Sequence, residues 1–480
     1  MNKETRFYYD ALKLVKEADP TIMDAIFDEF ESQRTRLKLI ASENYSSLAV
    51  QAAAGNLLTD KYSEGIVGAR FYAGCENIDR IELRARDLAC KLFGADYACV
   101  QPHCGSDANM LAYWMIINAR VIAPYLCMKN VKTVSDLTKK EWEELREMCN
   151  NQRLLTMDYY SGSHLTHGYR MNMSGQLFDV YTYGVNEQGI IDYDAVEKQA
   201  LEVQPMILLA GYSAYPRKID FERFREIADK CGAVLMVDMA HFAGLVAGKV
   251  FTDEYNPVPY ADVVTSTTHK TLRGPRGGLV LCKNWLKPYA EKACPYMMGG
   301  QLPHIVAAKA IAFGEALKPE FHDYAQRIVS NAQMMSGAFK SLKVPVLTGG
   351  TDNHMVIINV FKKYGLTGRQ AEAALSECNI CVNRQAIPND PNGNWYCSGL
   401  RIGTPAITTL GMNGFDVVEI ANLIDYVLKN TAKSGKVKYA VDKIVRRSAI
   451  KQIEKMLSRK EKMLYPKVNI NKLRKKLYKK

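Results

Sequence analysis

One lysine ends a β-branched stretch and stands before a turn rich in glycine and arginine. Lys270 follows Val263-Val264-Thr265-Ser266-Thr267-Thr268-His269, and Arg273 and Arg276 come soon after it. A strand that delivers a lysine to the mouth of a pocket, beside cations that depress its pKa, suits Schiff-base chemistry. A surface lysine at a strand end is the plainer interpretation, and this stretch alone leaves it ahead.

An aspartate occupies the corresponding place after another strand. Ala233–Val237 is typical of a buried strand, and Asp238 follows it directly. Because ligands of open α/β sheets bind outside the carboxyl ends of strands, Asp238 and Lys270 can face one crevice. A buried carboxylate needs a partner, and the protonated ring nitrogen of pyridoxal phosphate is one. The alternative is that Asp238 caps a following helix.

Two further features are suited to binding anions. His103-Cys104-Gly105-Ser106 is a small-residue turn that enters a helical segment, so Gly105 and Ser106 can hold a phosphate at the helix start. Arg401 is a candidate for forked binding of a substrate carboxylate. Each signal is weak alone, because many helices begin with Gly-Ser and a lone arginine more commonly forms a structural ion pair.

These residues need a scaffold, and 480 residues are long for one domain. Strand-like runs alternate with helical patterns over residues 51–310, which predicts an α/β domain with a mainly parallel sheet. A helical arm (1–50) precedes it, a smaller α+β domain (311–430) follows, and residues 431–480 form a basic tail. Residues of about 117–155 interrupt the large domain as an insertion. Within it, Thr138 to Glu141 has capping-box spacing, and Trp142, Leu145 and Cys149 can share one helix face.

Composition indicates where the charge lies, which compartment suits the protein and which kinds of site are not expected. The tail holds 18 Lys and Arg against 3 Asp and Glu, a balance of +15 within a total of +12, so the rest of the chain is near neutral. The twelve cysteines show no paired or zinc-like spacing, which favours reduced thiols in a cytoplasmic compartment and predicts no metal site. No apolar run approaches the roughly 20 residues of a membrane helix, so no membrane span is expected.

Eight stretches, in order over residues 5–430, resemble serine hydroxymethyltransferases, a family of fold-type I pyridoxal-phosphate enzymes. They are Leu39-Ile40-Ala41-Ser42-Glu43-Asn44-Tyr45, Asp60-Lys61-Tyr62-Ser63-Glu64-Gly65, Val100-Gln101-Pro102-His103, His164-Leu165-Thr166-His167-Gly168, Val237-Asp238-Met239-Ala240-His241, Thr267-Thr268-His269-Lys270, Thr351-Asp352-Asn353-His354 and Gly403-Thr404-Pro405-Ala406-Ile407. The resemblance implies the aspartate-aminotransferase-like fold, a large domain with a mainly parallel sheet flanked by helices plus a smaller α+β domain.

The resemblance also implies roles for individual residues. Lys270 would hold pyridoxal phosphate as a Schiff base, and Asp238 would pair with the ring nitrogen. The other implied cofactor contacts are His164 on the ring, His241 and Ser213 near its phenolic oxygen, Gly105 and Ser106 on the phosphate, and Tyr62 and Gly300 from a neighbouring subunit. Ser42 and Arg401 would bind the serine carboxylate, with Tyr72 and the proton carrier Glu64 from the neighbouring subunit. Tyr159, Leu165, Phe71 and Gln385 would border the folate.

The implied reaction is reversible: L-serine and tetrahydrofolate give glycine and 5,10-methylenetetrahydrofolate. Because the site borrows residues from a second chain, a homodimer or a dimer of dimers is expected. The chain departs from the family pattern at Cys104 for serine, Phe71 for tyrosine, Gln385 for asparagine and Gln301 for proline. A thiol is a poorer hydrogen-bond donor than a hydroxyl, so one phosphate contact is weakened, and the other changes point to altered folate binding.

Two alternatives remain open at the level of sequence. One keeps the fold but drops folate, which leaves an aldolase for threonine and other β-hydroxy amino acids. The other concerns the tail, where the cluster Lys472-Leu473-Arg474-Lys475-Lys476 can bind RNA or another polyanion. A solvated, partly disordered extension is the favoured interpretation of that tail, because runs of like charge are commonly disordered. Ile450, Ile453 and Leu457 have helical spacing within it, however, and this amphipathic stretch can also dock on the body of the protein or on an acidic surface.

Overall fold

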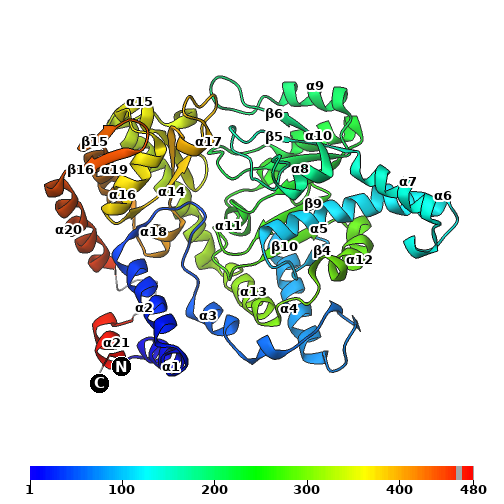
Figure 1. Cartoon of the computed structure of the whole chain (residues 1–480), viewed down its shortest axis with the longest axis horizontal. Coiled ribbons are helices and arrows are strands. Elements are labelled where there is room, and N and C mark those ends of the chain that lie inside the picture. Colours follow the sequence, from blue (N-terminus) through cyan, green and yellow to red (C-terminus); the bar gives the residue numbers. More distant parts are fainter. Residues whose placement is uncertain (461–467, 479–480) are drawn as a thin grey trace. The chain divides into compact units, whose positions relative to one another are not determined.

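The computed structural model describes residues 1–460 and 468–478 and divides the chain into two compact units. The first comprises Met1–Leu48, Arg327–Ala386 and Asp390–Lys480, and the second comprises Ala49–Gln326 and Ile387–Asn389. In this division the N-terminal arm and the C-terminal tail belong to the same unit as the smaller sheet (Figure 1).

The second unit contains a seven-stranded sheet, which confirms the predicted fold class. Its strand order is β4-β10-β9-β8-β7-β5-β6. All neighbours are parallel except β10, which runs antiparallel to both β4 and β9. The strands are β4 (Tyr97–Cys99), β5 (Gln152–Met157), β6 (Phe178–Tyr183), β7 (Ile207–Gly211), β8 (Val234–Asp238), β9 (Val263–Thr267) and β10 (Gly278–Cys282).

Every residue of β7, β8, β9 and β10 is buried, so these strands show no alternation of polar and apolar side chains. Continuous apolar runs are typical of parallel sheets covered on both faces. One such layer is helix α5 (Gly105–Ile117), whose Leu111 and Met115 join Val263 and Val280 in a single core cluster. The helices α4 (Glu76–Phe93), α9 (Tyr193–Val203), α10 (Phe221–Cys231), α12 (Lys287–Met298) and α13 (Pro303–Ala316) complete the unit's main helical cover.

Strand direction decides where the candidate residues lie. Because β4, β5, β7, β8 and β9 run the same way, their carboxyl ends meet at one edge of the sheet, where ligands of such sheets bind. The phosphate turn at Gly105, the Asp238 carboxylate and Lys270 follow β4, β8 and β9 respectively. The sheet therefore delivers all three to that edge.

Helix α5 continues into the expected insertion. A π-helical turn (Asn118–Ile122) and α6 (Ala123–Met128) extend it to Met128. By length and composition the stretch Gly105–Met128 could cross a membrane, although the sequence predicted no such run. Its most apolar window is 61% buried, and packing of α5 against β9 and β10 accounts for that apolar character.

The predicted helix of the insertion is confirmed as α7 (Lys139–Asn150). Thr138 and Glu141 form the expected reciprocal capping box at its start. Leu145 is fully buried, while Trp142 is 41% exposed. Trp142, Leu145 and Cys149 do share one face, because all three line a groove of about 600 Å³ beside α5 and α12.

The first unit is built on a three-stranded antiparallel sheet ordered β11-β14-β13. Its strands are β11 (Met355–Asn359), β13 (Asn383–Gln385) and β14 (Gly399–Gly403). A short parallel pair joins the N-terminal segment β1 (Leu37–Lys38) to β12 (Ile380–Cys381). Helices α16 (Gly368–Glu377) and α19 (Gly414–Lys429) also belong to this unit, as does α14 (Pro319–Ser341) from Arg327 onward.

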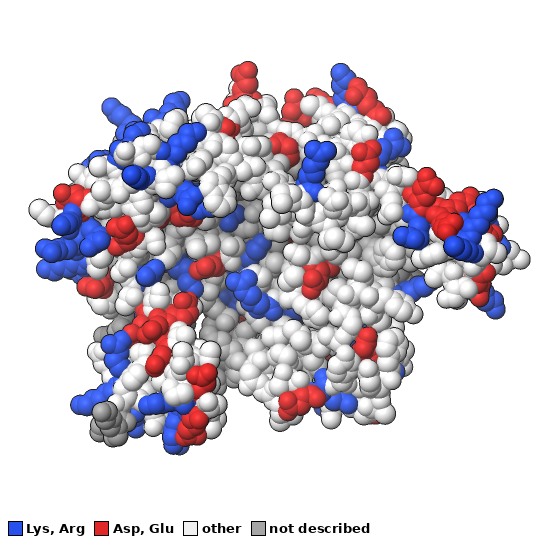
Figure 2. Space-filling model, viewed as in Figure 1, with Lys and Arg blue, Asp and Glu red and all other residues white. Residues whose placement is uncertain are grey.

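The basic tail is folded, so the prediction of a solvated extension is wrong for its described part. A hairpin of β15 (Thr431–Ser434) and β16 (Lys438–Val441) leads into α20 (Lys443–Lys460) and, after the gap, α21 (Ile470–Leu477). Ala449, Ile453 and Met456 of α20 are fully buried in the core cluster that includes α19. Burial of this apolar stripe outweighs the charge repulsion that suggested disorder. The basic side chains lie outside, as Figure 2 shows over the hairpin and α20.

Candidate active site

Lys270 lies in a tightly closed turn between β9 and β10. Thr268 fixes both ends of this turn: its amide donates to the Gly277 carbonyl at 3.0 Å, and its hydroxyl donates to the Pro275 carbonyl at 2.7 Å. The Gly274 amide closes back on the Thr268 carbonyl at 2.7 Å. Only 9% of Lys270 is exposed. The lysine is thus a buried residue on a braced turn, and the interpretation as a surface lysine is wrong.

Asp238 ends β8 as a fully hydrogen-bonded carboxylate. Its Oδ2 accepts from Asn109 Nδ2 and from His167 Nε2, both at 2.9 Å, and its Oδ1 accepts from the Ala240 amide at 2.9 Å. Burial opposes ionisation, but the His167 hydrogen bond and charge, the charge of Lys270 and the Asn109 hydrogen bond outweigh it, so the pKa of Asp238 is lowered well below its usual range. Asp238 is therefore an anion within the field of Lys270.

A chain of polar side chains connects Asp238 to His164. Asn109 Nδ2 also donates to Thr166 Oγ1 at 2.8 Å, and that oxygen lies 2.7 Å from His164 Nδ1. The sequence named His167 only inside a motif and gave Asn109 no role, so both are residues of the candidate site that it missed. The His164–His167 spacing was the available signal, because it lets one loop place two rings on the Asp238 side of the sheet.

The predicted phosphate turn is the N-terminus of α5, the helix that begins at Gly105. Its backbone N–H groups and the helix dipole favour an anion there. A Cβ at Gly105 would lie 2.6 Å from Thr267 Cγ2, so only glycine lets this turn approach the end of β9 so closely. Cys104 is the N-cap residue, and its thiol accepts from the Asp107 amide at 3.4 Å, a weaker cap than a hydroxyl would provide.

Other predicted residues come from the same strand ends. Ser213 follows β7, and its amide donates to the Gly162 carbonyl at 2.8 Å, which joins the β7 and β5 loops. His241 follows β8, is almost fully buried, and its carbonyl accepts from Thr271 Oγ1 at 2.9 Å. The β5 loop also carries Tyr159 and the exposed Leu165.

The residues assigned to a neighbouring subunit gather together within this chain. The rings of Tyr62 and Tyr72 meet edge to face at 4.9 Å. A Cβ at Gly300 would lie 3.3 Å from the Tyr62 ring, and one at Gly299 would lie 3.9 Å from the Glu64 carboxylate. Tyr62, Phe71 and Tyr72 are 57%, 62% and 47% exposed, so this cluster presents aromatic surface to its surroundings.

A buried hydrogen-bond network, which the sequence did not predict, fixes the backbone of the loop that carries Glu64. The Arg70 guanidinium donates to the Ser63 and Gly65 carbonyls at 3.1 and 2.8 Å and pairs with Glu82 at 2.8 Å. Gln101 Nε2 donates to the same Gly65 carbonyl at 3.0 Å and to Glu82 Oε1 at 2.9 Å. The backbone on both sides of Glu64 is therefore fixed, while its own carboxylate forms no hydrogen bond within residues 1–460 and 468–478.

Gln301, the departure from the family's proline, joins this network. Its Nε2 lies 3.5 Å from Glu82 Oε2, and the side chain is 4% exposed. The turn at Gly300 is thereby linked through one carboxylate to the Glu64 loop.

The remaining predicted residues, Ser42, Arg401 and Gln385, belong to the first unit. Arg401 lies in β14, is 8% exposed, and donates from Nε to Asn383 Oδ1 at 3.1 Å. The amide of Gly403 bonds to the Leu39 carbonyl at 2.7 Å, so the segment that leads to Ser42 packs beside the strand of Arg401. The carboxylate site predicted from Ser42 and Arg401 is thus supported by neighbouring segments of this unit.

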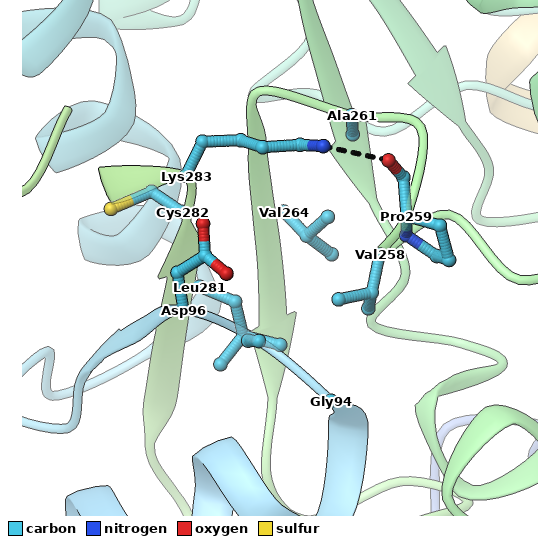
Figure 3. Close-up of a pocket in the computed structure, with 10 residues that line it drawn as sticks. Gly94, Asp96, Val258, Pro259, Ala261, Val264, Leu281, Cys282 and Lys283 are labelled. Atoms are coloured by element: carbon cyan, nitrogen blue, oxygen red, sulfur yellow. Dashed lines mark hydrogen bonds between the residues drawn. The ribbon is translucent and has the colours of Figure 1, made fainter. Parts of the chain in front are cut away.

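A separate cavity of about 110 Å³ lies at the opposite end of β9 (Figure 3). It is bordered by Val264, near the start of β9, and by Cys282, at the end of β10. Lys283 spans it and donates to the Pro259 carbonyl at 2.7 Å. Because β9 separates this cavity from Lys270, it is not part of the candidate active site.

The donor set at the sheet edge fits pyridoxal phosphate. An ionised buried carboxylate suits a protonated ring nitrogen, a buried lysine amine suits the aldehyde, and a helix N-terminus on a glycine that admits no Cβ suits the phosphate. The carboxylate ends β8, the lysine follows β9, and the glycine lies in the turn between β4 and α5. All three therefore lie at the carboxyl ends of parallel strands, where ligands of such sheets bind.

Comparison with known proteins agrees with this chemistry. A family model described as "Serine hydroxymethyltransferase" matches residues 15–129 and 124–424. Curated proteins of that name include one from Salinispora tropica, 51% identical over 95% of this chain and 97% of its own length, and one from Chlamydia muridarum, 47% identical over 97% and 95%. A third, from Treponema pallidum, is 50% identical over 96% of this chain and 81% of its own length. The resemblance inferred from the motifs is confirmed: the chain belongs to the serine hydroxymethyltransferase family.

Proposed function

We propose that the protein is a pyridoxal-phosphate-dependent glycine hydroxymethyltransferase. It moves the hydroxymethyl carbon of L-serine to tetrahydrofolate and gives glycine and 5,10-methylenetetrahydrofolate, reversibly. The observation that carries the proposal is the buried Lys270, in the turn after β9, together with ionised Asp238 at the end of the neighbouring strand β8, in a chain about half identical to relatives of that name.

Some residues of the site hold the cofactor, and one transfers a proton. The cofactor supplies an electron sink for the electrons released at the amino-acid Cα. Asp238 keeps the ring nitrogen protonated by charge, and His167 and Asn109 keep Asp238 ionised and oriented. Glu64 carries the proton between the serine hydroxyl, or the folate, and the leaving carbon, and its carboxylate is left available for that task.

Ser42 and Arg401 are proposed to hold the amino-acid carboxylate. A guanidinium forms two parallel hydrogen bonds to a carboxylate, which fixes the orientation of the bond to be cleaved. The Asn383 contact at Arg401 Nε leaves the guanidinium in a defined orientation for this purpose.

The working unit is proposed to be a homodimer or a dimer of dimers. Its support is the cluster of Tyr62, Glu64, Tyr72 and Gly300, since the residues that would serve a second subunit lie together and expose aromatic surface. A cytoplasmic location is proposed as well, because all twelve cysteines are free thiols, as a reducing compartment would keep them.

The folate is proposed to lie near Tyr159, Leu165, Phe71 and Gln385. Phe71 keeps an exposed ring for stacking but lacks the hydroxyl of tyrosine. Gln385 directs its amide to the neighbouring Ala386 carbonyl at 3.2 Å. Affinity for the folate is therefore expected to differ from that of relatives with tyrosine and asparagine at these positions.

One assay separates the proposal from the aldolase alternative. Enzyme loaded with pyridoxal phosphate is mixed with L-serine, with and without tetrahydrofolate, and glycine is measured. Folate-dependent glycine release is expected, and the Lys270→Ala variant is the matched control. Cleavage of allo-threonine combined with a serine reaction that ignores folate would instead establish the aldolase.

A second proposed activity, weak binding of RNA or another polyanion, concerns the basic tail. The predicted cluster Lys472-Leu473-Arg474-Lys475-Lys476 lies in α21, where Leu473 is buried and Arg474 pairs with Glu31, so α20 offers further basic side chains for this binding. Lys443, Arg447, Lys451 and Lys455 of α20 are exposed and form no ion pair with any described residue. Reversing Lys451 and Lys455 to glutamate should weaken salt-sensitive RNA retardation in a gel, because phosphate contacts dominate such binding. Reversal of the exposed pair Lys139 and Lys140 in α7 is the control, and equal loss in both variants would contradict a role for the tail.

A further inference from the structure

A fully buried lysine outside the predicted site lies next to both of its turns. Lys309 of α13 is 1% exposed. Its Nζ donates to three backbone carbonyls: Val100 at 2.6 Å, Pro102 at 2.8 Å and Gly278 at 2.9 Å. Val100 and Pro102 lie between β4 and the phosphate turn, and Gly278 begins β10 after the Lys270 turn. One side chain thus bonds to the two segments that would hold the two ends of the cofactor.

The three acceptors match an ammonium group. A charged lysine has three N–H donors, whereas a neutral amine has only two and would turn its lone pair toward the third carbonyl. Burial lowers the pKa of Lys309 to about 8, which still leaves the protonated form in the majority at neutral pH. No carboxylate among the described residues forms an ion pair with it. The group is therefore a buried positive charge whose direct hydrogen-bond partners are three backbone carbonyls, with Glu82 and Asp107 acting on it at longer range.

Close packing shows that the lysine occupies the junction of the two turns. The Pro102 carbonyl that binds Lys309 also accepts from the Gly278 amide at 2.9 Å. A Cβ at Gly278 would lie 2.2 Å from the Cys104 carbonyl, and one at Gly277 would lie 2.4 Å from Lys309 Cε. The phosphate turn and the Lys270 turn are thus joined directly by the Gly278–Pro102 hydrogen bond, and Lys309 adds three further hydrogen bonds at the same junction.

We propose that Lys309 is a positioning residue for the cofactor: its ammonium fixes the phosphate turn relative to the Lys270 turn and places a positive charge behind the N-terminus of α5. This inference rests on the proposed use of pyridoxal phosphate. The buried charge adds to the helix dipole at the place where the dianionic phosphate is expected, and low local polarity strengthens its effect. Lys309 itself makes no contact that would make it a catalytic residue.

The test compares pyridoxal phosphate with pyridoxal, which lacks the phosphate. The variant Lys309→Met has an unbranched side chain of similar length but lacks the charge and the three hydrogen bonds. It should weaken the affinity for pyridoxal phosphate about tenfold or more while changing the affinity for pyridoxal by less than about threefold. Affinities are measured by the visible absorbance of the bound cofactor, and Phe313→Leu, a buried change on the same helix, is the control that should leave the ratio of affinities unchanged.

Two additions keep the inference falsifiable if Lys309→Met does not fold. Lys309→Gln is also neutral but retains hydrogen-bond donors, and it should show the same loss of phosphate preference. The wild-type enzyme should keep its preference for pyridoxal phosphate between low salt and about 0.5 M KCl, because a buried charge is screened far less than surface charges.

The outcomes separate this inference from the proposed function. Wild-type enzyme that acquires no visible absorbance with pyridoxal phosphate would overturn the proposed function and this inference with it. Wild-type enzyme that binds the cofactor, together with variants that keep the wild-type ratio of affinities or lose both ligands equally, would overturn the role of Lys309 alone. A preference that disappears in salt would also overturn it.

Discussion

His167 Nε2 lies 2.9 Å from Asp238 Oδ2, and both groups are buried at the end of β8. This contact lets a carboxylate remain ionised where burial alone would neutralise it.

Replacing His167 by leucine should destabilise the protein by about 3 kcal/mol or more, because the partner carboxylate is left buried and less compensated. The pKa of Asp238 is below its unfolded value, so its stabilising contribution is present above the unfolded pKa near 4 and is lost as pH falls through the folded pKa. Unfolding by urea at pH 7, pH 4 and about pH 2.5 measures this, and the difference between wild type and variant should shrink mainly below pH 4. A difference that grows on acidification would contradict the assignment.

The Lys270→Ala variant should lose the visible absorbance of covalently bound cofactor and all serine turnover, because no other described lysine lies in the β9–β10 turn. The fold should survive, since the turn is braced by Thr268 rather than by the lysine side chain. Absorbance spectra and circular dichroism on the same sample check both statements. Retained absorbance in this variant would place the cofactor elsewhere.

Mixing two inactive variants should restore activity if Glu64 serves the neighbouring subunit. A dimer formed from one Lys270→Ala chain and one Glu64→Gln chain has one intact site, so random exchange should recover about a quarter of wild-type activity. Exchange of subunits is verified by native mass measurement. Absence of recovery in verified mixed dimers would place Glu64 in the site of its own chain.

The Cys104→Ser variant should strengthen the start of α5. The thiol accepts from the Asp107 amide at 3.4 Å, and a serine hydroxyl is a better cap, which is worth about 0.5–1 kcal/mol of stability. Affinity for pyridoxal phosphate should rise, because a hydroxyl also donates better to phosphate. Thermal unfolding and cofactor dissociation are measured beside the exposed-cysteine control Cys127→Ser, which should change neither.

His269, the neighbour of Lys270, should make the enzyme lose stability in mild acid. Burial, with the charges of Lys270 and Arg276, lowers the pKa of His269 to about 3. Between that value and the unfolded pKa near 6.5 the unfolded chain binds the extra proton, so stability falls with decreasing pH by up to about 1.4 kcal/mol per unit. His269→Asn should flatten this slope in unfolding measured at pH 7.5 and pH 5.5. An unchanged slope would show that other groups govern it.

The sequence predicted those features that depend on local pattern. Lys270, Asp238 and Gly105 each follow an apolar strand, and parallel strands bring such positions to one edge, so their convergence was predictable. The capping box at Thr138 was equally local. Motif resemblance, rather than spacing, supplied the roles of His164 and Glu64.

What escaped prediction depends on contacts between distant segments. Asn109 reaches Asp238 across 129 positions, and Lys309 reaches the Val100 carbonyl across 209. Nothing in the local pattern of α13 or α5 specifies such partners. The prediction that the tail is solvated was wrong for a related reason. The charge of the tail is visible in the sequence, but the core cluster that buries Ile453 is formed by residues from other parts of the chain.

The position of β10 between β4 and β9 has a consequence for biosynthesis. Cys99 of β4 pairs with Val280 of β10, so the edge strand next to the phosphate turn has no sheet partner until roughly 180 further residues have been translated. At about 5–20 residues per second that wait is on the order of ten to forty seconds. The ribosome-bound chain can form the parallel strands first. The phosphate turn is completed only when β10, the antiparallel strand, has been translated and pairs with β4. Cofactor capture is therefore a late event in the maturation of each newly made chain.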